Sequence, residues 1–411
     1  MVVLDLRAVQ QEMFCFPRHL LAIALLVLPV SLLVLTAACA KNSPAVSDPD
    51  GAATADGAGE TSADTAEDTA ADATTTRADL AWPVDQPGPY HVGYRTLPLT
   101  YVPAPDGVTR TIQLSLWYPT DDKTGTPAVY SPAWPVPHED VFQDAKLAPP
   151  ADPSGYPVHA FTHGHLGFAG SAPYMVRHFA SHGWLVIAPD HTGNTLANAN
   201  DPKPPQIYWW REKDMEAAID WLQNLPKDDP LHQKARTEKI FLSGHSFGST
   251  DTWALAGVPY EVDTVKAHCD AVDCTPQAIA LYQAGFTDTR VVAAAQLAGG
   301  VDGGVFALGA PKFVHIPLMV MNATGDVQHP AGPLWEPLQH GWHVEIAGGC
   351  HQTFGLGVCD PPVTEDVGPP IVWTYTLALA RNVVLGDSGA QVLGILDGSV
   401  QVSSYATLQK K

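Results

Sequence analysis

Ser246 is the residue of this chain whose surroundings best suit nucleophilic chemistry. It stands in Gly244-His245-Ser246-Phe247-Gly248, between the short apolar run 239–243 and the helix-compatible run 249–256. A serine on a sharp strand-to-helix turn leaves no room for side chains two positions before and after it, which explains both glycines. The pattern predicts a catalytic serine at a nucleophile elbow. The alternative is an ordinary glycine-rich loop with an incidental serine.

A serine hydroxyl is a weak nucleophile until a base takes its proton. His351 follows the last predicted strand, 343–347, and is the candidate base. The base needs a carboxylate to orient it, and Asp326 follows the preceding predicted strand, 317–323. The order serine, aspartate, histidine on successive strand ends favours a catalytic triad. Asp302, after the predicted strand 291–297, is the rival acid.

The oxyanion of an acyl-transfer reaction needs two N–H donors. The backbone N–H of Phe247, which follows the nucleophile, is the first candidate, and that of His165 is the second. His165 belongs to the glycine-containing loop 162–167, with Leu166 as the next choice. His163 and His165 could instead be zinc ligands, but no third ligand stands at a suitable spacing. We therefore expect neither a metal nor another cofactor.

Apolar runs alternate with helical ones after an opening hairpin, formed by 91–102 and 110–118. Residues 120–155 read as a proline-rich loop. Six strands are predicted at 157–162, 184–189, 239–243, 291–297, 317–323 and 343–347, and four helices at 172–182, 210–225, 249–256 and 371–385. Such alternation predicts an α/β fold with a mostly parallel central sheet and helices on both faces. The insertion 257–290, after the nucleophile helix, is a candidate small cap.

Three blocks, 163–166, 179–191 and 244–248, resemble the platelet-activating-factor acetylhydrolase and dienelactone-hydrolase-like α/β-hydrolases, and the resemblance spans about 89–395. It implies the α/β-hydrolase fold and a serine esterase acting on short or moderate acyl groups without a metal. Dienelactone hydrolases carry cysteine where this chain has Ser246. The eukaryotic acetylhydrolase has its acid after the preceding strand, which keeps Asp302 in consideration.

The helix-start sequence Arg211-Glu212-Lys213-Asp214 also resembles an Arg-x-x-Asp feature of that group. We expect Arg211 and Asp214 to form a structural ion pair.

Residues 1–39 read as an export segment of bacterial lipoprotein type. An uncharged stretch, 20–38, ends in small residues directly before Cys39, whose thiol would be lipidated. An uncleaved anchor and a cleaved secreted protein are the alternatives, and all three place the rest outside the cytoplasm. Residues 40–80, rich in Ala, Asp and Thr, read as a disordered acidic tether, and 81–411 as the catalytic domain.

Four cysteines outside the export segment fall into two local pairs, Cys269 with Cys274 and Cys350 with Cys359. Pairing within each local pair is the simplest connectivity in an oxidising compartment, although two other connectivities are open.

The formal net charge of −21 argues against nucleic acid as a partner. We expect a monomer whose partners are small or polymeric ester substrates, with membrane contact through a lipid anchor at Cys39. A non-catalytic surface-binding lipoprotein and a peptidase of the same fold are the alternative functions. Six aromatic residues either line a substrate cleft or pack in the core, namely Trp134, Tyr208, Trp209, Trp210, Trp335 and Trp342.

Overall fold

The computed structural model describes residues 80–103, 107–131, 134–198, 206–267, 274–300, 305–307 and 309–411. The predicted export segment, nearly all of the predicted tether, Asp302 and Cys269 lie outside these ranges. No helix within them is long and apolar enough to cross a bilayer.

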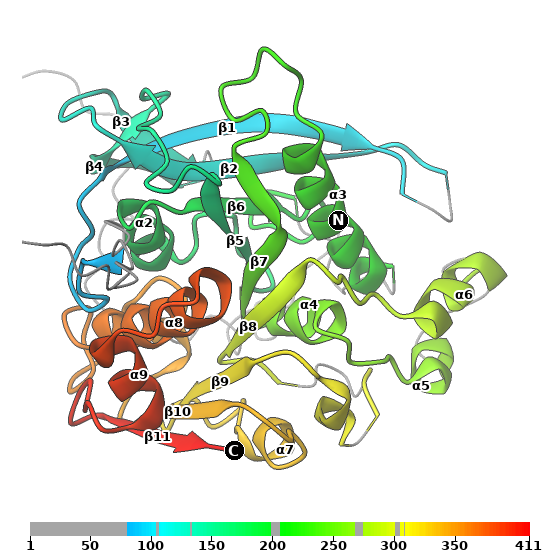
Figure 1. Cartoon of the computed structure of the whole chain (residues 1–411). Helices are drawn as coiled ribbons and strands as arrows, with labels where there is room; N and C mark the ends of the chain where they lie inside the picture. The colour runs from blue at the N-terminus through cyan, green and yellow to red at the C-terminus, as the bar shows by residue number, and fades with distance from the viewer. Residues whose placement is uncertain are drawn as a thin grey trace, which may run out of the picture. The chain divides into compact units, whose positions relative to one another are not determined.

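One large sheet organises the domain (Figure 1), in the order β11-β10-β9-β8-β7-β5-β6-β2-β1-β4-β3. The strands are β1 His91–Tyr101, β2 Arg110–Thr120, β3 Pro127–Ser131, β4 Trp134–Gln143, β5 Tyr156–Thr162, β6 Leu185–Asp190, β7 Ala235–His245, β8 Val291–Leu297, β9 Leu318–Ala323, β10 Trp342–Ile346 and β11 Ala406–Lys410. The six central strands, from β6 to β10 in space, all pair in parallel. The predicted α/β-hydrolase fold is confirmed.

Helices cover both faces of the sheet, as predicted (Figure 1). On one face α2 (Pro173–Ser181), α8 (Gly368–Leu385) and α9 (Ala390–Asp397) pack with the sheet into one apolar core. On the other, α3 (Ile207–Gln223) and α4 (Gly248–Leu255) share a second core. Because both faces are covered, the central strands are buried along their length, as every residue of β5 and β9 is.

The region 120–155 is not the loop that its prolines predicted. It contains β3 and β4, which pair with each other, while β4 pairs in parallel with β1. Strand β3 is the edge strand, and β4 beside it pairs with β1 only through residues 141–143. Both therefore have stretches of unpaired backbone where proline is tolerated, and the β3–β4 register shifts twice. Neither α9 nor β11, near the C-terminus, was predicted from the sequence.

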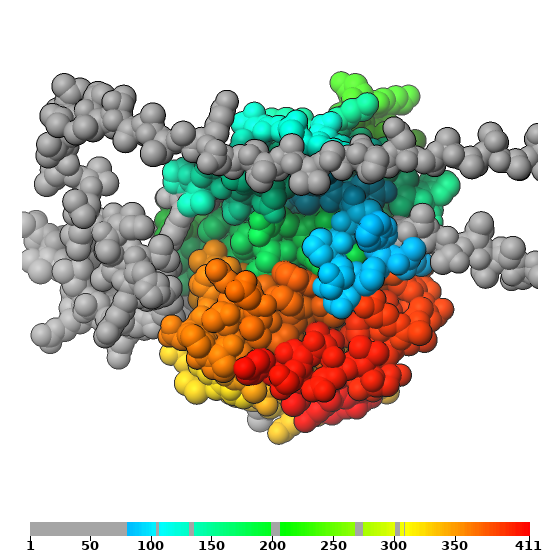
Figure 2. All heavy atoms as spheres, turned by 90° about the vertical axis from the view of Figure 1, so that its left-hand side faces the viewer, coloured from blue at the N-terminus to red at the C-terminus, as the bar shows by residue number. Residues whose placement is uncertain are grey.

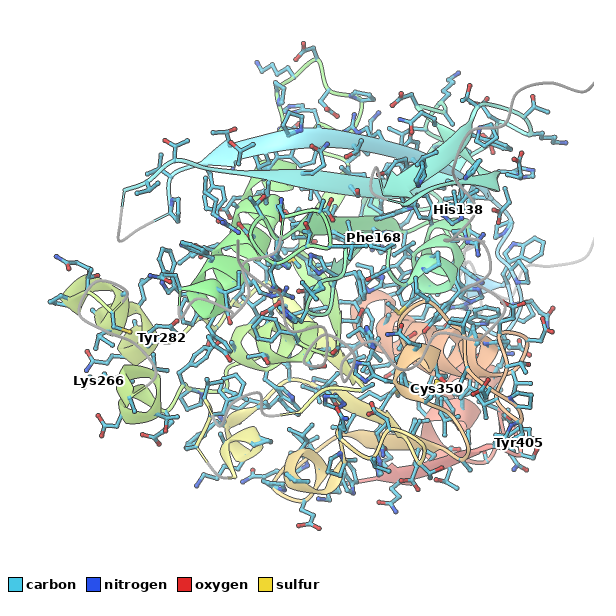
Figure 3. The ribbon with its side chains drawn as sticks, turned by 180° about the vertical axis from the view of Figure 1, so that it is seen from behind. His138, Phe168, Lys266, Tyr282, Cys350 and Tyr405 are labelled. Carbon is cyan, nitrogen blue, oxygen red and sulfur yellow. A yellow bond between two sulfur atoms is a disulfide. The ribbon has the colours of Figure 1, made fainter. Side chains whose placement is uncertain are left out.

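The insertion 257–290 contains α5 (Val262–Ala267) and α6 (Pro276–Ala284). Its aromatic residues pack together, with ring centroids of Tyr260 and Tyr282 5.0 Å apart. In Figure 3, Lys266 and Tyr282 mark this insertion at one edge of the molecule, far from Cys350. Its role as a cap stays a prediction.

Candidate active site

Ser246 directly follows β7 and precedes the helix α4. Its φ is +56°, a left-handed conformation that a serine adopts at a cost, and its amide donates to Leu297 O at 2.9 Å. A Cβ at Gly244 would lie 2.1 Å from Gly248 O, and one at Gly248 would lie 2.2 Å from Thr162 O. Neither position therefore accepts a side chain. Ser246 lies on this strained turn, just past the end of the strand, and is partly exposed.

His351 and Asp326 lie at the carboxyl ends of two neighbouring parallel strands. Asp326 is in the turn after β9, and His351 opens the short helix η4 (His351–Thr353) after β10. The Nδ1 of His351 is 2.6 Å from Asp326 Oδ2. Since an ionised carboxylate only accepts, Nδ1 donates and the other ring nitrogen, Nε2, is left as the proton acceptor.

Asp326 remains ionised. Burial alone would raise the pKa of this carboxyl group, but hydrogen bonds from His329 and His351 hold the pKa well below its ordinary value. An ionised acid suits a group that must stabilise an imidazolium.

The rings of two further histidines lie close to His351. The ring of His245 lies 4.7 Å from that of His351, and its Nε2 donates to the backbone O of His351 at 3.1 Å. Burial first, and His351 nearby, lower the pKa of His245 well below its ordinary value, so this ring is neutral. His329 stacks on His351, with ring centroids 4.6 Å apart, and donates from Nδ1 to Asp326 Oδ1 at 2.9 Å. Neither contact was predicted from the sequence.

A disulfide joins Cys350 to Cys359, with Cα atoms 5.9 Å apart, and this predicted pairing is present. The bridge closes the loop that begins at His351 (Figure 3, Cys350). The predicted partner of Cys274 lies outside the described residues, so the pairing with Cys269 stays a prediction.

The predicted oxyanion loop runs close to the nucleophile. A Cβ at Gly164 would lie 3.0 Å from Ser246 Cβ, so the glycine permits this approach. His165 follows, with its Nδ1 2.6 Å from Asn194 Nδ2, an amide that donates to it. Phe247, the other predicted donor, stands at the N-terminus of α4, where backbone N–H groups point out of the helix.

Neither ring nitrogen of His163 is open to a metal ion. Its Nε2 accepts from the amide of His191 at 3.1 Å, so its Nδ1 donates to Gly164 O at 2.7 Å. Burial first, and then His191 and Arg211, lower the pKa of His163 well below its ordinary value. This histidine supports the oxyanion loop rather than a zinc ion.

Arg211 and Asp214 are both buried and ion-paired, but not with each other, so the predicted pair is wrong. Arg211 binds Asp251 at 2.7 Å, while Asp214 binds Arg110 at 2.6 Å. Arg211 also donates to Asn194 Oδ1 at 2.8 Å and to the backbone O of His163. The guanidinium thereby fixes the predicted oxyanion loop, 162–167, through the carbonyl of His163.

The six aromatic residues divide between the two predicted roles. Tyr208 lies against the Phe247 ring, with centroids 5.3 Å apart, and so adjoins the elbow. Trp209 and Trp335 are buried in the core, and Trp342 donates its indole N–H to Leu396 O. Trp210 lies against the Arg110 guanidinium, 5.0 Å from its ring centroid. The side chain of Trp134 is outside the described part.

Residues 140–268 match the family model described as Chlorophyllase, a family of α/β-hydrolase-type esterases. The matched segment spans 129 of the 411 residues and includes the predicted oxyanion loop and Ser246, but not Asp326 or His351. No curated protein matches the chain. The match supports ester hydrolysis as the general activity.

Proposed function

We propose that the protein is a serine carboxylic-ester hydrolase acting on short or moderate acyl esters. The observation that carries the proposal is the left-handed Ser246 at the elbow, together with the 2.6 Å contact between His351 and Asp326 on nearby strand ends. The family match to 140–268 supports the reaction class. Phospholipid-type, aromatic and polyester esters are its candidate substrates.

In this mechanism Ser246 Oγ attacks the ester carbonyl carbon while His351 Nε2 takes its proton. Asp326 keeps Nδ1–H in place and stabilises the imidazolium. The backbone N–H groups of Phe247 and His165 bind the oxyanion of the tetrahedral intermediate. His351 then protonates the leaving alkoxide, which departs as the alcohol. A water molecule, deprotonated by the same nitrogen, hydrolyses the acyl-enzyme and regenerates Ser246.

The test is hydrolysis of p-nitrophenyl acetate and butyrate by the wild type and by Ser246→Ala. We expect turnover by the wild type alone, and one fluorophosphonate label per chain that Ser246→Ala abolishes. A non-catalytic surface lipoprotein would show neither turnover nor label. A peptidase would be labelled but would cleave peptide substrates better than esters.

We further propose that the enzyme is a monomer held outside the cytoplasm through a lipid at Cys39. The proposal is supported by the apolar stretch 20–38 and by the small residues before Cys39. Metabolic labelling with radioactive palmitate should mark the wild type and not Cys39→Ser. An unlabelled, membrane-bound wild type would favour an uncleaved anchor instead.

A further inference from the structure

Asp326 contacts two histidines, and the proposed mechanism uses only one of them. His351 donates to Oδ2 at 2.6 Å and His329 to Oδ1 at 2.9 Å. One nitrogen or oxygen from each of the three side chains lies within 4.8 Å of the others, the one such grouping found in the described parts of the chain. The side chains of His329 and His351 are 26% and 24% exposed, so an ion can reach them from solvent.

The chemistry of this donor set selects a class of ion. Two imidazole nitrogens and one carboxylate oxygen suit Zn²⁺ and similar borderline ions, which bind such ligands at about 2.0–2.2 Å. Mg²⁺ and Ca²⁺ prefer oxygen ligands alone. The spacings from Asp326 to the two histidine nitrogens are those of hydrogen bonds, so each histidine must move away from the carboxylate by less than about 1 Å to admit zinc. His329 stands in an exposed turn, which allows this movement.

We propose that Asp326, His329 and His351 form an inhibitory site for Zn²⁺. The inhibitory part rests on the proposed function. The ion takes the place of the two Nδ1 protons that now bond to Asp326. Each imidazole stays neutral by carrying its one proton on Nε2 instead, so Nε2 of His351 can no longer accept the proton of Ser246. His351 then loses its carboxylate partner and is fixed by the ion, so it no longer serves Ser246. The active and the zinc-bound states therefore exclude each other.

Calorimetric titration of the Ser246→Ala protein with ZnCl₂ tests the site without needing catalysis. We expect one ion per chain, no binding of MgCl₂, and at least about tenfold weaker zinc binding after a further His329→Phe change. Phenylalanine keeps a flat ring against His351 but lacks the ligand nitrogen. The matched control is His340→Phe, which removes an exposed histidine just before β10, at the opposite end of that strand from His351. It should leave zinc affinity unchanged.

The second measurement is zinc inhibition of ester turnover, with each variant normalised to its own zinc-free rate. The zinc concentration for half inhibition should rise at least about tenfold in His329→Phe and stay unchanged in His340→Phe. Equal binding by wild type and His329→Phe, absence of binding, or binding without inhibition would each overturn the proposal. If the wild type hydrolyses no ester, the proposed function fails, while calorimetry still decides whether the zinc site exists.

Discussion

Asp326 tests the proposed mechanism most directly, because its one role there is to orient and charge-stabilise His351. Asp326→Asn keeps the shape of the side chain but removes its charge. It also replaces one of the two acceptor oxygens, which now contact the two histidines, by an NH₂ group that can only donate. We expect kcat for p-nitrophenyl butyrate to fall about 10³–10⁴-fold with the fold intact by circular dichroism. Asp302→Asn is the control and should cost far less activity. The opposite ranking would transfer the acid role to Asp302.

Asp190, at the end of β6, gives a prediction for pH. Burial raises the pKa of this carboxyl group from 3.8 to about 6, against a lowering contribution from the amide of Ala169. An acid whose pKa is higher in the folded than in the unfolded protein does not affect the free energy of unfolding below its unfolded pKa. It lowers that free energy as the pH rises from there through about 6. Asp190→Asn can still accept from Ala169 and should stabilise the protein by about 1–2 kcal/mol at pH 8.

At pH 3, below the unfolded pKa of 3.8, wild type and Asp190→Asn should unfold at the same urea concentration, since the side chain is then mostly neutral in both the folded and the unfolded state. Urea titrations at pH 3 and pH 8 make the comparison. A stability difference that does not grow with pH would contradict the assignment.

Sequence predicts the positions of the site residues better than their partners. Gly-x-Ser-x-Gly signals Ser246 because the steric demand of the elbow is local. Asp326 and His351 are predictable as residues that follow strands. His329 is not, because one histidine among 17 in a turn carries no signal until the fold places it against Asp326. Arg211 likewise pairs with Asp251, 40 positions away in the chain, and not with its helix neighbour Asp214.

At the scale of elements, the loop after β10 depends on its disulfide. The bridge between Cys350 and Cys359 closes a loop of sequence separation 9. Within this loop the hydroxyl of Thr353 accepts a hydrogen bond from the amide of Cys350 at 3.0 Å. Replacing both cysteines by serine should lower stability by about 2–3 kcal/mol, because the unfolded chain regains its entropy. Activity should also fall, since His351 would need reordering to reach Ser246.

Differential scanning calorimetry and ester turnover of Cys350→Ser/Cys359→Ser measure the two effects. Cys269→Ser with Cys274→Ser is the control and should affect turnover less. If the loop variant loses stability but keeps full turnover, the bridge stabilises the fold without organising the base.

The central strands were predictable because burial on both faces leaves continuous apolar runs such as β5 and β9. Strands β3 and β4 were not, because β3 at the edge and the incompletely paired β4 beside it accept prolines and polar residues that are typical of a loop. Strand β11 is too short for its alternation of apolar and polar residues to be informative, and its partner β10 lies far back in the chain.

At the scale of the whole molecule, the segment 80–90 fastens the catalytic domain. Figure 2 shows it, in blue, lying against the orange and red surface of α8 and α9. Buried Arg381 donates to the backbone oxygens of Leu80 and Trp82, both at 2.6 Å. His178 lies 2.9 Å from Val84 O, and, because a carbonyl only accepts, its Nε2 donates. The segment thus satisfies buried donors of two helices.

This fastening makes the domain boundary testable. A protein of residues 76–411 keeps the whole segment, so it should match the full chain in melting temperature and in kcat/KM. A protein of residues 91–411 leaves Arg381 and His178 without these acceptors, and burying unsatisfied donors costs about 1–3 kcal/mol each. We expect it to lose on the order of 3 kcal/mol or more, measured by urea unfolding of both proteins. Equal stability of the two would mean that the domain begins at β1 and that 80–90 belongs to the tether.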